Sequence, residues 1–397
     1  MYASYPALFR FLLGTAWFLY ASVGQAQTVD SSITRTVYDD GFYMVSDDQT
    51  LRFGGRIQTD FHWSTTQGGE WLIRRARMLA TGYAFPHFRY MLSARFDRGE
   101  AELDQAFVES RHLPYVRVRA GQFKEPFSQS RLLSSLQLDL MERPMVVNAL
   151  TPTSDIGLMA FGDVLGGSLE YAVGVFNGRP FNQPENNRAK DVVGRLVARP
   201  FAHRKAAASH LYVAISGASG LRNDSLDLVS FETHRGTAFY PHASVLQHDG
   251  RLTRLGADLE WLWSRYTLRA EWLRGQWSDV RHTQTNGQLE VAGFYITAGL
   301  MLTDDEKPRT TLLYPQHEFH PMQGEWGAWE VVLRYEQMTI TNPLAERFTA
   351  RDPYRTSAWT AGLNGYLTEH IKWSLVSQWA TWTAQEHSVL TRIQVAF

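Results

Sequence analysis

Apolar and polar residues alternate with a period of two along most of this chain. In the segment 88–97, one side carries Phe88, Tyr90, Leu92, Ala94 and Phe96, and the other carries Arg89, Ser93, Arg95 and Asp97. The segments 266–272, 329–336 and 371–375 follow the same rule. Successive side chains of a β-strand point to opposite faces of a sheet. The pattern therefore predicts strands that each have one apolar and one polar face.

Alternation also occurs in soluble β-sandwiches, and two further features favour a membrane barrel. Tryptophans lie near the expected strand ends, where a barrel meets the membrane interfaces: Trp71, Trp261, Trp263, Trp272, Trp329, Trp373 and Trp379. The last segment alternates Ile393, Val395 and Phe397 with polar residues, and a terminal aromatic of this kind is typical of outer-membrane barrels. We expect an all-β, transmembrane, antiparallel β-barrel of about 16 strands, formed by residues 27–397 as one domain.

The first 26 residues are typical of a cleaved secretory signal. Arg10 precedes an apolar run from Phe11 to Val23, and Gly24 and Ala26 are small residues at the positions that a signal peptidase reads. The run is shorter than a membrane-spanning helix requires, so an uncleaved anchor is the weaker alternative. We therefore expect export to the Gram-negative outer membrane, with outer-membrane lipid and lipopolysaccharide as the surroundings.

Charge and cysteine content exclude several functions. The formal net charge of −1 argues against a nucleic-acid partner. The chain has no cysteine, which excludes disulfides, thiol catalysis and cysteine-based metal sites. Of 39 basic residues only five are lysines, so arginine dominates the positive charge. Either genomic composition or the recognition of anions by planar guanidinium groups explains this preference.

If the apolar strand faces meet lipid, several arginines must point into the lumen. Arg89, Arg95 and Asp97 lie opposite the apolar side of their strand, and Arg117 and Arg119 lie opposite Val116, Val118 and Ala120. In the segment 71–79 the same reasoning predicts that Arg75 and Arg77 face the lumen, and it places Arg74 on the lipid-facing side. A charge facing lipid costs about 2–4 kcal/mol at mid-depth. Arg74 is thus predicted to lie at a rim, a bulge or a subunit interface.

Residues 124–155 lack the period of two. A connection of this length is usually functional or disordered. This one carries Leu132, Leu133, Leu136, Leu138 and Leu140, which makes it too apolar for a solvated loop. We expect it to pack inside the barrel and to form a constriction.

No motif of an enzyme, metal site or cofactor site is convincing. His317 and His320 have the wrong spacing for a zinc protease helix, and Gly217 to Gly220 lacks the pattern of a nucleophile elbow and is more typical of a turn. Paired acids on strand faces would suit a secreted glycosidase, but any β-protein with 40 acids offers such pairs. We predict that the chain is not an enzyme and has no cofactor and no metal.

A series of motifs, taken in order, resembles the phosphate-selective porin O and P family. They are WLIRRARML at 71–79, GQFKEPFS at 121–128, MER at 141–143, LTP at 150–152, GVFNG at 174–178, GAWEVVLRYE at 327–336, WTAGLNGYL at 359–367 and the terminal RIQVAF. The resemblance covers nearly the whole chain after the signal. It implies a 16-stranded barrel, usually a homotrimer, that passes small anions such as phosphate and whose third loop folds inward.

The resemblance also implies an anion site. Arg74 and Arg75 match the family's paired arginines, Lys124 and Ser128 match its basic and hydroxyl positions, and Asp97 is the candidate for its acidic partner. Arg131 and Arg143 are neighbouring candidates. The chain departs from the phosphate-specific members in having Arg77 after the pair and few lysines elsewhere. Phosphate specificity therefore stays open.

We expect an outer-membrane porin for small anions, plausibly phosphate or other oxyanions, with an arginine-lined pore. The candidate pore residues are Arg74, Arg75, Arg77, Arg95, Asp97, Arg117, Arg119, Lys124, Ser128, Arg131 and Arg143. One alternative is a non-selective or organic-acid porin on the same barrel, in which the lumenal arginines only pair with neighbouring acids. The other is a secreted β-rich enzyme or carbohydrate-binding protein.

Overall fold

The structure is a computed structural model. It describes residues 35–38, 42–46, 49–97, 99–180, 189–204, 207–225, 231–240, 246–282, 285–341 and 353–397. The predicted signal segment, residues 1–26, lies outside the described residues.

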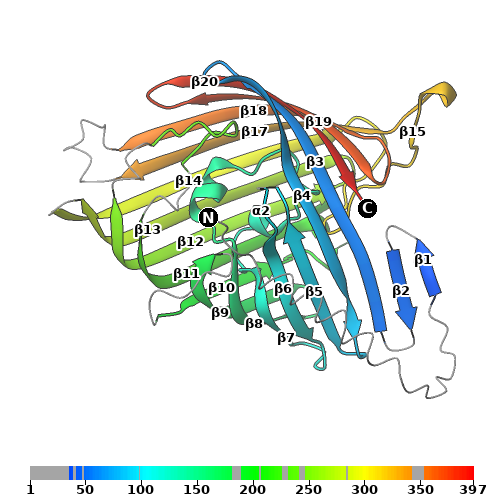
Figure 1. The fold of residues 1–397 in the computed structure, drawn as a ribbon, viewed down its shortest axis with the longest axis horizontal. Coiled ribbons are helices and arrows are strands. Elements are labelled where there is room, and N and C mark those ends of the chain that lie inside the picture. Colours follow the sequence, from blue (N-terminus) through cyan, green and yellow to red (C-terminus); the bar gives the residue numbers. More distant parts are fainter. Residues whose placement is uncertain are drawn as a thin grey trace, which may run out of the picture.

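Within these ranges, sixteen antiparallel strands form a closed barrel (Figure 1). They are β3 Gln49–Ser64, β4 Gly68–Ala84, β5 Phe88–Arg95, β6 Glu102–Ser110, β7 Arg117–Lys124, β8 Ser154–Val164, β9 Leu169–Pro180, β10 Asp191–Ala198, β11 Leu211–Ser225, β12 Gln247–Trp263, β13 Tyr266–His282, β14 Thr285–Met301, β17 Ala328–Thr341, β18 Tyr354–Tyr366, β19 Ile371–Thr381 and β20 Gln385–Ala396. Each strand pairs with the next, and β20 closes the barrel by pairing with β3. The predicted barrel is confirmed.

Four short strands and two 3-10 turns of the described chain are not among the sixteen barrel strands. Strands β1 Arg35–Tyr38 and β2 Phe42–Ser46 form a hairpin beside the start of β3. A second hairpin, β15 Phe319–His320 and β16 Glu325–Trp326, encloses the 3-10 turn η5 Pro321–Gln323, and a further turn, η2 Ala207–His210, precedes β11.

The period of two places apolar side chains outside and polar ones inside, as predicted. Leu92 on β5, Val108 on β6 and Leu158 on β8 are more than half exposed on the outer surface. Ser93 and Arg95 on the opposite face of β5 are buried toward the lumen. Lipid-facing apolar residues and lumen-facing polar residues are the arrangement that a membrane solvent imposes on a barrel.

The two ends of the barrel differ in their connections. We call the end at which β20 stops the turn end; several of its connections are short, such as 85–87, 165–168 and 367–370. The opposite loop end carries the long connections 125–153 and 226–246. Bacterial barrels have short periplasmic turns and longer outer loops, so we expect the turn end to face the periplasm.

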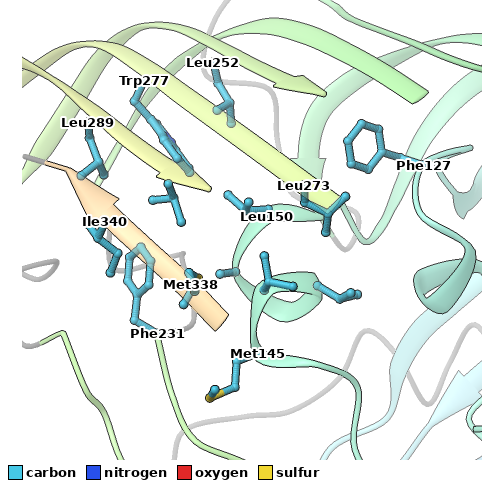
Figure 2. Packing of buried hydrophobic residues seen from close by; sticks show 14 of the residues in the cluster. Phe127, Met145, Leu150, Phe231, Leu252, Leu273, Trp277, Leu289, Met338 and Ile340 are labelled. Atoms are coloured by element: carbon cyan, nitrogen blue, oxygen red, sulfur yellow. The ribbon is translucent and has the colours of Figure 1, made fainter. Parts of the chain in front are cut away.

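Residues 125–153, here called the inner segment, fold into the barrel, as predicted. They contain the short helices α2 Gln129–Leu132 and α3 Met145–Leu150. Figure 2 shows Phe127 and Leu150 of this segment packed among Leu273 and Trp277 of β13. The other buried partners from the wall include Leu252, Leu289, Met338 and Ile340. Burial of this apolar surface holds the segment against one side of the lumen.

Glycines on the wall make room for the inner segment. A methyl group added at Gly275 would lie 2.7 Å from a Leu150 Cδ, and one added at Gly362 would collide with Leu140. The absence of a side chain at these two positions lets β13 and β18 approach the segment closely.

One sequence expectation needs correction, and one connection was not anticipated. Residues 217–220, expected to form a turn, lie in the middle of β11 and pair in register with β12. Their glycine, alanine and serine side chains are small, but small residues do not end a strand when both neighbours supply a continuous hydrogen-bond ladder. The long turn-end connection 302–316 also enters the lumen, where Lys307 reaches Asp139 of the inner segment. No period in its sequence indicated this.

Candidate functional site in the barrel lumen

A cavity of about 1260 Å³ lies in the lumen between the inner segment and the wall formed by β3 to β11. Among the described residues, thirteen arginines and one lysine line it, against five carboxylates. Every arginine that we predicted for the pore contributes to this lining, and so do Asp97 and Lys124. The sequence reasoning missed four arginines: Arg56, Arg195, Arg199 and Arg309.

A β-bulge explains why Arg74 and Arg75 share a face. The pairing of β3 with β4 shifts between Gln58 and Thr59, which oppose Arg75 and Ile73 and leave Arg74 as the extra residue. A bulge sets two residues against one and re-aims a side chain. Arg74 therefore turns into the lumen with Arg75, as one of the three predicted explanations requires.

Both bulge arginines meet one carboxylate of the inner segment. Arg74 donates two hydrogen bonds of 3.0 Å to Glu142, and Arg75 donates two, of 3.1 and 3.5 Å, to the same group. Arg392 of β20 donates to Glu142 at 2.8 Å and is itself paired with Asp60. Although burial opposes it, the positive charge of Arg74, Arg75 and Arg392 holds the pKa of Glu142 well below its usual range. Glu142 is thus an ionised anchor between the inner segment and the wall.

Four other predicted arginines are paired with acids one or two strands away. Arg77 donates to Asp104 at 2.6 Å, Arg119 to Glu109 at 2.6 Å, and Arg117 to Asp163 at 3.3 Å. Arg95 donates to Glu102, which lies directly opposite it in the pairing of β5 with β6. These pairs fix the guanidinium groups along the cavity wall and reduce the net charge that they present.

Five further cations of the cavity lining donate only to neutral oxygens among the described residues. One of them, Arg199, donates to the carbonyl of Ser209. We call the other four, Arg56, Lys124, Arg131 and Arg143, the unpaired quartet. Lys124 donates to the carbonyls of Leu132 and Leu133, at 3.0 and 2.8 Å. Arg56 donates to the Ser134 hydroxyl at 2.8 Å. Arg131 and Arg143 donate to the following groups: the Thr151 hydroxyl, the Asn148 side chain and the carbonyls of Val147, Ser130 and Leu133.

Burial weakens the charged forms of Arg131 and Arg143, and repulsion by neighbouring cations adds to this at Arg143. Burial lowers the pKa of Arg131 to about 10, although Glu271 opposes the change. Burial, together with the positive charges of Arg131 and Arg75, lowers the pKa of Arg143 well below its usual range. Cations held close together without a carboxylate create a strongly positive region. An anion bound there would relieve this repulsion.

The two remaining predicted residues have different positions. Asp97 follows β5 at the cavity wall, and its Oδ1 accepts no hydrogen bond from the described residues. Ser128 is almost fully buried and is not part of the cavity lining. Its hydroxyl accepts from the Arg131 amide at 3.2 Å and so caps α2. The structure therefore gives Ser128 a role in holding the inner segment rather than a place at the cavity.

The sequence pattern could have identified some of the missed arginines but not all of them. Arg56 lies on the same face of β3 as Gln58 and Asp60, so extending the period of two to this strand would have found it. Arg195 could be found on β10 in the same way. Arg309 lies in the irregular connection after β14, where it donates to Glu260 at 2.8 Å and to Glu170 at 3.2 Å. Only the fold brings it to the cavity.

None of the described helices is long and apolar enough to cross a membrane. In a comparison of folds, the chain is similar to the trimer form of OmpT, an outer membrane protein of Vibrio cholerae, with a TM-score of 0.57 and 8% identity over 88% of this chain and all of that one. It is also similar to OmpF of Salmonella typhi in complex with daunomycin, with a TM-score of 0.56 and 9% identity over 91% and 100%.

A third similar structure is the outer membrane channel DcaP of Acinetobacter baumannii, with a TM-score of 0.58 and 9% identity over 90% of this chain and 99% of that one. No curated protein matches the sequence. The family profile described as phosphate-selective porin O and P matches residues 51–389. The chain therefore belongs to the phosphate-selective porin O and P family and is an outer-membrane β-barrel channel, not an enzyme.

Proposed function

We propose that this porin passes small anions, phosphate or other oxyanions among them, through the arginine-lined cavity. The observation that carries the proposal is the unpaired quartet, Arg56, Lys124, Arg131 and Arg143, at a cavity in which cations outnumber carboxylates. A charge that is at least partly buried and has no carboxylate partner is costly. A passing oxyanion would offset that cost by accepting hydrogen bonds from two or more of these side chains.

The chemistry of the quartet suits shallow binding. Guanidinium groups offer paired donors that match the oxygens of a phosphate or a carboxylate. Each member of the quartet already donates hydrogen bonds to neutral oxygens. An incoming anion would therefore replace these weaker acceptors. Conduction requires binding that favours entry and still permits release. The carboxylate-paired arginines along the wall would attract anions to the site without holding them.

A second candidate, a porin without selectivity among small anions and organic acids, is favoured by the paired arginines. A carboxylate partner within the protein neutralises much of the positive charge of four arginines: Arg77, Arg95, Arg117 and Arg119. Under this hypothesis only the size of the cavity and the sign of its field select the solute.

We also propose that the channel assembles as a homotrimer in outer-membrane lipid and lipopolysaccharide. The support is the family resemblance and the similarity to a barrel that is itself described in a trimer form. Chemical crosslinking in native membranes, with three-chain products expected, tests this assembly. A product limited to single chains would contradict it.

The function is tested in planar bilayers with the full-length porin. Under a potassium chloride gradient, the sign of the reversal potential should indicate a preference for anions. Added phosphate should block the chloride current. Lys124→Gln and Arg56→Gln should each raise the dissociation constant of the block about tenfold, since a hydrogen bond to a charged group is worth about 1.5–3 kcal/mol.

Arg274→Gln is the matched control, because Arg274 lies on the outer face and pairs with Glu290. It should leave the block unchanged. A reversal potential for cation preference would refute the proposed function. Phosphate block that is equal in the wild type, Lys124→Gln and Arg56→Gln would show that the quartet is not the site.

A further inference from the structure

Part of the cavity wall is apolar, which transport of inorganic anions does not explain. The lining includes Met91 of β5, Phe107 of β6, Met159 and Phe161 of β8, Ala172 of β9 and Val197 of β10, which we call the apolar strip. Phe161 and Ala172 are only partly buried, so part of the strip is open to the cavity. Phosphate gains nothing from such a surface.

Arginines border the strip and stack on its rings. The Arg119 guanidinium carbon lies 4.3 Å from the ring centre of Phe107 and 4.9 Å from that of Phe161. The Arg117 guanidinium carbon lies 4.8 Å from the Phe161 ring centre. Guanidinium groups at these distances are attracted by the faces of aromatic rings. One ring, that of Phe161, therefore has two guanidinium groups within 5 Å of its centre.

The register of the strands creates this arrangement. Phe161 is opposite Arg117 in the pairing of β7 with β8, and Met159 is opposite Arg119. On the other side, Phe161 is opposite Ala172 of β9, whose side chain is a single methyl group, and Phe161 is only partly buried. Ring, small apolar side chain and guanidinium therefore lie side by side on one inner face of the wall.

Arg117 retains donors for a ligand. Its side chain is one-third exposed, and its partner Asp163 is 3.3 Å away and half exposed. An exposed ion pair of this length contributes little, so a ligand carboxylate can displace or share it at small cost. Arg117 thus places an available cation next to the Phe161 ring.

We propose that the apolar strip is a binding site for aromatic carboxylates. The carboxylate accepts hydrogen bonds from Arg117, and the ring lies on Phe161 and Ala172, where it removes apolar surface from water and stacks beside the guanidinium groups. This inference rests on the proposed anion channel and names a second class of solute for it. The site uses other side chains than the unpaired quartet, whose members make no cation–π contact with the described residues.

The test measures block of the chloride current by benzoate, cyclohexanecarboxylate, acetate and phosphate in planar bilayers. In the wild type, benzoate should block at about one-tenth of the acetate concentration and more tightly than cyclohexanecarboxylate. Phe161→Ala should bring benzoate close to acetate and leave the phosphate block unchanged. Phe161→Tyr keeps the ring and should keep the benzoate block.

Two further variants distinguish loss of the proposed binding site from a general failure to fold or assemble. Phe161→Leu keeps an apolar side chain of similar volume, and it should lose the preference for benzoate over cyclohexanecarboxylate even if Phe161→Ala fails to assemble. Phe61→Ala removes the same side chain from the outer face, where Phe61 packs against Trp71, and it should change no block.

Failure of this inference is distinct from failure of the channel function. The wild type could prefer anions and be blocked by phosphate, yet be blocked by benzoate only as weakly as by acetate, or equally by benzoate and cyclohexanecarboxylate. That result would overturn the aromatic site and leave the proposed channel function intact. Unchanged benzoate block in Phe161→Leu would also overturn it. Cation preference with no block by any of the four anions would refute the function, and the site with it.

Discussion

At the residue scale, the charge of the lumen depends on which cations have a carboxylate opposite them. Arg95 and Glu102 are register partners, and so are Arg119 and Glu109. Such cross-strand pairs form wherever both residues face inward on adjacent strands. Arg131 and Arg143 come instead from the inner segment, and neither forms an ion pair with a carboxylate of the described residues. The unpaired quartet exists because this segment folds against the wall.

Glu125, the residue after β7, provides a prediction about pH. It is buried, and its Oε2 accepts no hydrogen bond from the described residues. Burial raises the pKa of Glu125 from 4.5 to about 8; Arg254 opposes the change, and Asp191 and Asp155 add to it. Because the folded state binds this proton more tightly than the unfolded chain, stability is full below about pH 4.5 and falls as the pH rises toward 8.

Glu125→Gln should therefore remove part of this pH dependence. At pH 5 the variant should match the wild type, and at pH 9 its unfolding free energy should be higher by at least about 1.4 kcal/mol, the value of one pKa unit. Thermal unfolding in detergent across this range is the measurement. Glu100→Gln, at an exposed residue, is the control. Parallel curves for wild type and Glu125→Gln would contradict the assignment.

At the element scale, two connections from opposite ends of the barrel hold each other in the lumen. Lys307 of the turn-end connection donates to Asp139 of the inner segment at 2.7 Å and to Glu330 of β17 at 2.6 Å. Arg269 of β13 also donates to Asp139. Although burial opposes it, the charges of Arg269 and Lys307 hold the pKa of Asp139 well below its usual range. The position of the inner segment therefore depends on this network as well as on apolar packing.

The close approach of the inner segment to β18 predicts the effect of a larger residue at Gly362. Gly362→Val should push Leu140 and its neighbours away from the wall, because a Cβ at this position collides with Leu140. Overpacking of this kind costs about 1–3 kcal/mol. The expected result is a lower unfolding temperature and a smaller single-channel conductance, since the displaced segment occupies more of the lumen.

Gly194→Val is the control for this change. The nearest atom to a Cβ at Gly194 is a backbone oxygen 3.8 Å away, so a side chain there has room. Both readouts should stay at their wild-type values in the control. Equal conductance in Gly362→Val and the wild type would mean that the segment does not narrow the current path.

At the scale of the whole molecule, closure of the sheet satisfies the backbone in a membrane. The pairing of β20 with β3 leaves the barrel wall without an open edge between its first and last strands. A closed barrel without disulfides should resist sodium dodecyl sulfate at room temperature and unfold on heating. We expect the unheated and heated protein to migrate differently on gels. Identical migration after folding in detergent would contradict the closed barrel.

The sequence by itself determined the barrel and the direction of its side chains. A period of two is a local property, so Arg89, Arg95, Arg117 and Arg119 could be assigned to the lumen without coordinates. The misfit of Arg74 was also visible, since an extra residue breaks the alternation. The apolar content of residues 124–155 was sufficient to predict their burial, because leucines in a loop need a partner surface.

The tertiary structure alone decided which charges lack a counter-charge. Ser128 caps a helix, Arg309 reaches the lumen from a turn, and Phe161 lies within 5 Å of the guanidinium groups of Arg117 and Arg119. These facts depend on the register between strands and on contacts between segments far apart in the chain. Local periodicity carries no information on such contacts, because the free energy that selects them arises only when the barrel closes around the inner segment.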